Sequence, residues 1–176
     1  VYALTRQADA PSDTSLLLAE RKRRDGQGSA VMNSLMIFGH VDAFVTLPGQ
    51  KQLIRGLESD MAGPELADVE GDESLKETAI KAGLVQYDLP MAGGLGQYGE
   101  TSAIVRYAAD GILTGHHVFT QLEAPKHQAG CFLQNIAAGV LTGEAPSIVE
   151  GVMLEGIDAP CNGQPALIPN GLPEPR

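Results

Sequence analysis

Two cysteines are the residues of this chain that most directly indicate chemistry. Cys131 begins an apolar, helix-like run, whereas Cys161 lies in a turn-like segment of proline, asparagine and glycine. Such a segment is a poor place for a small buried apolar residue, so a disulfide is the favoured interpretation. Closing a loop of about 30 residues stabilises a fold by about 3.5 kcal/mol, and an intact bond implies an oxidising compartment. Two free thiols and a metal site stay open as alternatives.

The histidines offer ligands for that metal site. His127 and Cys131 are four residues apart and would share one face of a helix. His116, His117 and Cys161 could complete a tetrahedral set, although adjacent histidines on a strand point to opposite faces. No Cys-x-x-Cys or His-Glu-x-x-His spacing supports the idea. We therefore expect no bound metal and no cofactor.

Residues Gly94 to Gly99 match the G-x-G-x-x-G pattern of dinucleotide-binding turns. Such a turn needs an unbroken buried strand before it, but Pro90 interrupts the preceding segment. No acidic residue follows about 20 positions later, where an acidic side chain would bind the ribose. We therefore interpret this segment as a turn between elements.

Serine, histidine and aspartate are all present, yet no Gly-x-Ser-x-Gly motif occurs. Asp42 lies near His40 in sequence, which we interpret as a coincidence within a turn. The acidic run 65–77 lacks the alternating spacing of a calcium loop, so a solvated loop is expected. The sequence therefore predicts no catalytic residue.

The charge of the chain argues against nucleic acid as the main partner. Its 22 acidic and 12 basic residues give a formal net charge of −10. The basic cluster 21–24 suits a solvated helix face or a contact with an acidic sister subunit. No apolar stretch reaches the length of about 18 residues that a membrane span needs, and no signal peptide is visible at Val1. Without an initiator Met, we expect a mature or shortened form.

The elements that position these residues begin with helices and continue with short strands. Helices are predicted over 13–24, 29–44, 52–57, 72–83 and 128–138, and strands over 84–85, 102–107, 116–122 and 166–168. In the helix 72–83, Ser74 and Glu77 have capping-box spacing and Gly83 is the terminating residue. The predicted buried residues of that helix are Leu75, Ala79 and Ile80. Segment 147–155 is ambiguous between helix and strand.

This order predicts an α+β fold in one domain, residues 1–176. A helical N-terminal segment (1–48) packs on an antiparallel sheet in the body (72–165), and a tail (166–176) follows a disulfide-closed C-terminal region. The sequence order resembles the globular half of type IVb pilins, of the thin-pilus, bundle-forming and toxin-coregulated kinds. The resemblance rests on a helix before Gly83, a glycine-rich segment 91–94, strands ending at 119–125, and Cys131 and Cys161 bracketing the C-terminal region. The hydrophobic N-terminal helix of that family is absent.

The resemblance implies a structural subunit of a type IV pilus-like filament, acting in assembly, adhesion or conjugation, with no catalysis. Its partners would be other pilin subunits and a host or recipient cell surface. A membrane would be contacted only through a segment not present in this chain, before assembly on the periplasmic side. One alternative is a small extracytoplasmic binding domain or enzyme that uses Gly94 to Gly99 and His116, His117 and His127. Another is an envelope accessory domain that does not polymerise.

Overall fold

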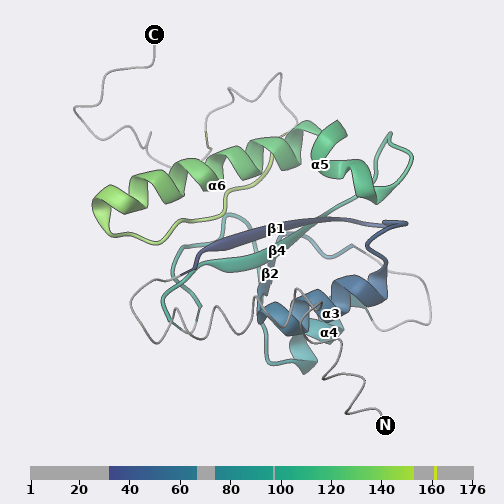
Figure 1. Cartoon of the computed structure of the whole chain (residues 1–176), viewed down its shortest axis with the longest axis horizontal. Helices are drawn as coiled ribbons and strands as arrows, with labels where there is room; N and C mark the ends of the chain where they lie inside the picture. The colour runs from purple at the N-terminus through teal and green to yellow at the C-terminus, as the bar shows by residue number, and fades with distance from the viewer. Residues whose placement is uncertain (1–31, 67–73, 97, 153–160, 162–176) are drawn as a thin grey trace, which may run out of the picture.

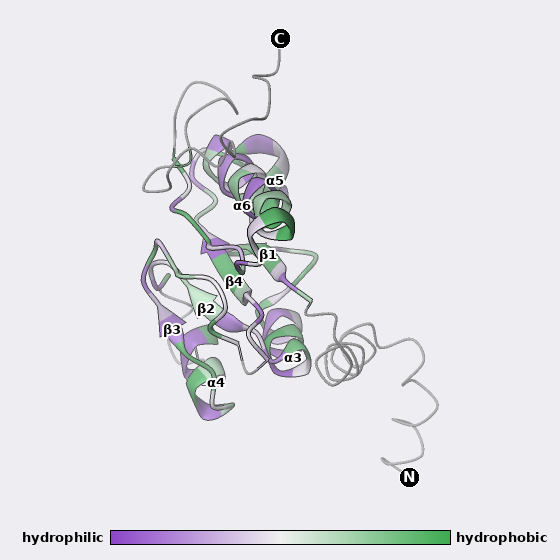
Figure 2. Cartoon of the chain, turned by 90° about the vertical axis from the view of Figure 1, so that its left-hand side faces the viewer, coloured by the Kyte–Doolittle hydropathy of each residue, from purple (hydrophilic) through white to green (hydrophobic). Residues whose placement is uncertain are grey.

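A computed structural model describes residues 32–66, 74–96, 98–152 and 161. The elements within these residues are β1 (Ser34–Gly39), α3 (Leu47–Leu57), β2 (Asp60–Ala62), α4 (Leu75–Lys81), β3 (Gln86–Tyr87), β4 (Ser102–Tyr107), the 3-10 helix η2 (Gly115–His117), α5 (Val118–Gln121) and α6 (Glu123–Thr142). They form three layers. Helices α5 and α6 lie on one side of the sheet and α3 and α4 on the other (Figure 1), and the same layers are visible after a quarter turn (Figure 2).

The sheet is four-stranded with the order β1-β4-β2-β3, and every pairing is parallel. The antiparallel sheet expected from the sequence is therefore wrong, whereas most of the N-terminal helical segment predicted to pack on it lies outside the described residues. Helix α3 connects β1 to β2 and α4 connects β2 to its neighbour β3, and such helical crossovers are what parallel strands need. The glycine-rich turns that suggested hairpins instead lie in longer connections before and after β4. Strand β4 is buried along nearly its whole length, as expected of a parallel strand covered on both faces.

Strand β1 replaces part of the helix that was predicted over 29–44. Its continuous apolar run satisfies both helical and strand spacing, so periodicity could not separate the two. Met36 and Phe38 pack into the core on the side of α3 and α4, whereas Leu35 packs into the core under α6. This alternation is the period of a strand. Ser34 pairs with Ser102, and each following residue of β1 pairs with the next residue of β4. Side chains at paired positions therefore face the same helix layer.

Helix α4 confirms the capping prediction. The Ser74 hydroxyl accepts from the Glu77 backbone N–H at 3.1 Å, and the Glu77 carboxylate accepts from the Ser74 N–H at 2.8 Å. Gly83 follows the helix at φ +79°, where glycine is favoured. Leu75 and Ala79 are buried as predicted, but Ile80 is 55% exposed, so that part of the predicted buried face is wrong.

The segment 116–122, predicted as a strand, is helical and forms η2 and α5. The predicted helix 128–138 is the central part of the longer α6, which has Pro125 near its N-terminus, where a missing N–H costs little. Phe132 of α6 packs with Ala62, Val105 and Ile148 in the core beneath it. Ile148 itself forms an antiparallel bridge with Met91, which is the only strand-like pairing of the described part of segment 147–155.

The Cys131–Cys161 disulfide is formed, which confirms that prediction. Other predictions fall outside the described residues: the helix 13–24 with its basic cluster, the edge strand 166–168, the tail, and the middle of the acidic run. No helix in the described ranges is long and apolar enough to cross a membrane.

Candidate active site

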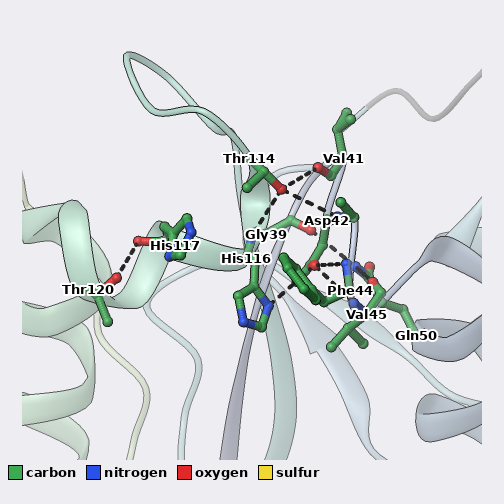
Figure 3. A network of polar contacts seen from close by, with 11 residues as sticks. Gly39, Val41, Asp42, Phe44, Val45, Gln50, Thr114, His116, His117 and Thr120 are labelled. Atoms are coloured by element: carbon green, nitrogen blue, oxygen red, sulfur yellow. Dashed lines mark hydrogen bonds and ion pairs between the residues drawn. The ribbon is translucent and has the colours of Figure 1, made fainter.

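An aspartate and a histidine from two neighbouring parallel strands meet at the carboxyl edge of the sheet. Asp42 follows β1, and His116 lies in η2, which follows β4. Asp42 Oδ1 is 3.4 Å from His116 Nδ1, and Figure 3 shows the two side chains facing one another. Because β1 and β4 are parallel neighbours, their carboxyl ends meet at one edge, where parallel sheets place their ligand and catalytic groups.

The Asp42 carboxylate is fixed by the backbone that follows it. Its Oδ1 accepts hydrogen bonds from the N–H groups of Phe44 at 2.7 Å and Val45 at 2.9 Å. The side chain is only 6% exposed, so these donors stabilise a charge that is shielded from water. These hydrogen bonds keep the carboxylate in one orientation toward the histidine.

The turn around Asp42 is bound to the loop that carries His116. Thr114 Oγ1 donates to the Val41 carbonyl at 3.3 Å and accepts from the Ala43 N–H at 3.3 Å. The Gly115 N–H also donates to the Val41 carbonyl, at 3.2 Å. Val41 has φ +54°, a conformation that costs energy for a β-branched residue. The surrounding bonds therefore hold the turn in a shape it would not adopt alone.

Two glycines allow these segments to touch. A Cβ at Gly39 would overlap the Gly115 carbonyl, and a Cβ at Gly115 would overlap the His40 carbonyl. The obstructing atoms at both positions belong to the backbone, so no side-chain rotation could make room for a Cβ. The close approach of β1 and η2 therefore depends on glycine at both positions.

The His116 ring is oriented on one side and accessible on the other. Its ring centroid is 4.4 Å from that of Phe44, its other ring contact is His117 at 5.4 Å, and its side chain is 43% exposed. We assign the imidazole proton to Nδ1 because the facing Asp42 carboxylate can only accept. Nε2 is then the basic nitrogen, as in a carboxylate–histidine pair that performs general-base catalysis.

Sequence reasoning missed this pair. Asp42 was compared with His40, its neighbour in the chain, whereas the structure places it against His116 from a distant segment. His116 was itself assigned to a strand and considered as a metal ligand. One signal was available: an aspartate directly after an apolar strand, followed later in the chain by a histidine after a second strand, is the order of acid and base in one class of hydrolases.

The histidines considered as metal ligands separate into two groups. His127 lies beside the disulfide, with Nε2 at 3.5 Å from Cys131 Sγ, and with Cys161 it forms a three-residue cluster. His116 faces Asp42 instead, and His117 belongs to the same turn. The tetrahedral set drawn from all of these residues is therefore not assembled.

The glycine-rich segment binds its own acceptors. The Gly94 N–H donates to Thr101 Oγ1 and the Gly96 N–H to the Glu100 carbonyl, at 2.9 and 2.8 Å. The buried Glu100 carboxylate lies against Gly96 and accepts from the Tyr98 N–H at 2.8 Å. A carboxylate thus occupies the position that a phosphate would need, and the segment precedes β4 instead of following a strand into a helix.

A pocket of about 510 Å³ opens on the same edge of the sheet as the Asp42–His116 pair. Its lining comes from the residues that end β4 and follow β2 and β3, including Pro64, Leu89, Val105 and Tyr107. The lining is largely apolar, with Glu150 and Arg106 among its charged members. Neither residue of the pair lines this pocket, so the two features share an edge without sharing a side chain.

Comparisons with family models, with curated proteins and with solved structures found no match to this chain.

Proposed function

We propose that this chain carries the acid and base of a hydrolase that cleaves esters or related acyl compounds. The proposal rests on one arrangement of side chains and backbone groups. A shielded carboxylate, fixed by two backbone N–H groups, faces Nδ1 of a half-exposed histidine at the carboxyl edge of a parallel sheet. This arrangement presents Nε2 of His116 to a substrate.

The two residues would divide the chemistry between them. His116 Nε2 takes the proton of a hydroxyl nucleophile while the hydroxyl oxygen attacks the acyl carbon, and then gives that proton to the leaving alcohol oxygen, so that an acyl-enzyme forms. Water then attacks the acyl carbon and passes a proton to His116 Nε2, which returns that proton to the nucleophile's oxygen as the acid is released. Asp42 holds the imidazole in the tautomer that leaves Nε2 basic, and it stabilises the imidazolium formed during the step. Asp42 is therefore a positioning residue and His116 is the catalytic base.

The nucleophile is expected N-terminal to β1. Among the described residues, no hydroxyl or thiol forms a hydrogen bond with the His116 ring. In α/β-hydrolases the nucleophile, the acid and the histidine follow in that order along the chain, and Asp42 precedes His116. Strand β1 lies at one side of the described sheet, with its first residues half-buried.

The surroundings of the pair favour a substrate with an apolar acyl group. Large apolar side chains are exposed in the segments that carry the pair: Val41 (69%), Phe44 (72%), Leu113 (94%) and Phe119 (50%). Exposed apolar clusters of this kind commonly mark binding surfaces. Phe44 contacts the His116 ring at a tilt, with ring centroids 4.4 Å apart, so an acyl chain bound there would lie next to the base.

The test measures the hydrolysis of p-nitrophenyl acetate and of p-nitrophenyl octanoate by the protein. His116→Asn is expected to lower kcat/KM by roughly 10³-fold and Asp42→Asn by a comparable factor, because each removes the oriented base. His117→Asn is the matched control, since it alters the neighbouring ring without touching Asp42, and it should change the rate less than about threefold. Equal rates in all variants, or no turnover of either ester by the folded wild type, would contradict the proposal.

The filament-subunit function stays a prediction, together with its partners and its location at the bacterial surface. The antiparallel sheet that the pilin resemblance implied is wrong, while the disulfide at the expected cysteines is compatible with an extracytoplasmic protein. A secreted hydrolase would share that compartment. The disulfide therefore supports the location without favouring either function.

A further inference from the structure

A second site lies on α6, independent of the Asp42–His116 pair. His127 and Cys131 are one helical turn apart on the same face, and both are buried. Cys161 is joined to Cys131, and the three potential ligand atoms all lie within 4.8 Å of one another. A buried imidazole beside two sulfurs is not needed for a disulfide, which is held by its own covalent bond.

We propose that His127, Cys131 and Cys161 form a Zn²⁺ site when the disulfide is reduced. A dithiol supplies two electrons and two protons to the S–S bond, which breaks to give two thiols, and the dithiol becomes a cyclic disulfide. Zn²⁺ then displaces both thiol protons and binds the two thiolates and His127 Nε2. The oxidised protein has no thiolate to offer, so zinc binding is confined to the reduced form.

The ligand chemistry and the spacing favour zinc over other divalent metals. Two thiolates and one imidazole are a soft set that suits Zn²⁺ and does not suit Mg²⁺ or Ca²⁺. Two thiolates on one tetrahedral zinc lie about 3.8 Å apart, given Zn–S bonds of about 2.3 Å. That separation falls within the 4.8 Å that already contains all three ligand atoms. Small side-chain rotations after reduction therefore suffice.

Two features prepare the site. His127 Nε2 lies 3.5 Å from Cys131 Sγ, so the imidazole is already directed at the position of the metal. Gln134 Oε1 lies 3.2 Å from Cys161 Sγ and keeps a polar group on the exposed side. With three protein ligands, the fourth position is open to water. Helix α6 lies across the sheet from α3 (Figure 1).

The test is a Co²⁺ titration of the whole protein, reduced with dithiothreitol and desalted without oxygen. One equivalent should bind with a thiolate-to-cobalt charge-transfer band, and Zn²⁺ should abolish that band. The oxidised protein should show no band. His127→Gln should weaken binding by at least about tenfold, whereas His117→Gln should bind like the wild type. Far-UV circular dichroism of oxidised His127→Gln checks that this variant folds.

Two results would overturn the proposal: reduced wild type that binds no cobalt, or reduced His127→Gln that binds as tightly as wild type. If reduction alone unfolds the chain, added Zn²⁺ must restore the circular dichroism spectrum, because metal binding then supplies folding free energy. Failure to restore it also overturns the proposal. Esterase activity is not a readout here, so this outcome is separate from that of the proposed hydrolase.

Discussion

The Asp42–His116 pair and the Cys131–Cys161 pair both join segments that are distant in sequence, but different forces hold them. The cysteines are joined by a covalent bond that begins on a helix. The aspartate and the histidine only face one another, with Asp42 Oδ1 3.4 Å from His116 Nδ1, and backbone hydrogen bonds and two closely approaching glycines hold their turns together. The first region would stay together through large changes elsewhere, whereas the second depends on the exact path of two loops.

The two regions therefore contribute differently to the molecule. Covalent attachment suits a segment that must be kept against the body, and it needs little help from neighbouring residues. A catalytic pair must instead leave one histidine nitrogen accessible. The contacts that hold the Asp42–His116 pair are therefore made away from that nitrogen, by the Asp42 turn and the Thr114 hydroxyl. A substitution that disrupts one region should therefore leave the other region intact.

The largest expected effect is on the covalent region. The double variant Cys131→Ser, Cys161→Ser should lose about 3.5 kcal/mol of unfolding free energy, because the closing loop of 30 residues no longer restricts the unfolded chain. Urea denaturation of the variant and the oxidised wild type measures this loss. Esterase activity of the folded variant should stay within about twofold of the wild type. An unchanged midpoint would mean that the disulfide does not support the fold.

A slightly smaller effect is expected from Gly115→Ala, which breaks the other region. The new methyl group would overlap backbone atoms of Gly39 and His40, so the variant should lose about 3 kcal/mol of stability and most of its hydrolytic activity. Gly130→Ala is the matched control on α6, where a Cβ meets nothing within 4 Å. That variant should gain up to about 1 kcal/mol from improved helix propensity. Similar stabilities for the two variants would contradict the close approach of β1 and η2.

The smallest effect concerns Tyr107, which connects the end of β4 to α6 through a 3.1 Å hydrogen bond from its hydroxyl to Gln128 Oε1. Burial, and to a lesser extent the Glu150 carboxylate, raises the pKa of Tyr107 above its usual value of 10.0. Below that value both states are protonated and the stability is fully present. As the pH rises above it, the unfolded tyrosine ionises first, so the folded state loses stability.

Urea midpoints measured between about pH 8 and pH 12 should therefore fall less steeply for Tyr107→Phe than for the wild type. The midpoint of the variant at pH 8 provides the control, because it isolates the cost of losing the Gln128 hydrogen bond. Parallel curves would show that the phenol keeps its ordinary acidity in the folded protein.

Local signals in the sequence predicted local structure well. The capping box at Ser74 and Glu77 satisfies backbone groups within one helical turn, so its spacing alone identifies it. The disulfide was predictable because Cys161 lies in a segment of proline, asparagine and glycine, where a small buried apolar residue is not expected. Nothing local distinguishes a strand from a helix in the run 34–39, and nothing local reveals that β4 inserts between β1 and β2. Parallel pairing depends on contacts between strands that are distant in sequence, so no local pattern predicts it.

The candidate site was missed for the same reason. Asp42 and His116 are brought together only by the adjacency of β1 and β4, which an antiparallel arrangement would not produce at this edge. Once the strands are known to be parallel, an acid after one and a histidine after its neighbour become an expected pair. The error in sheet topology therefore concealed this candidate pair.

The tautomer of His116 shows whether Nε2 is the basic nitrogen, as the proposed mechanism requires. Two-bond ¹⁵N–¹H NMR spectra of ¹⁵N-labelled protein, recorded at a pH where the imidazole is neutral, show which ring nitrogen is protonated. We predict that the wild type has the proton on Nδ1 and a bare Nε2, and that Asp42→Asn shifts the population toward Nε2–H. A wild-type His116 protonated on Nε2 would contradict the account, because the nitrogen assigned as the base could not accept a proton.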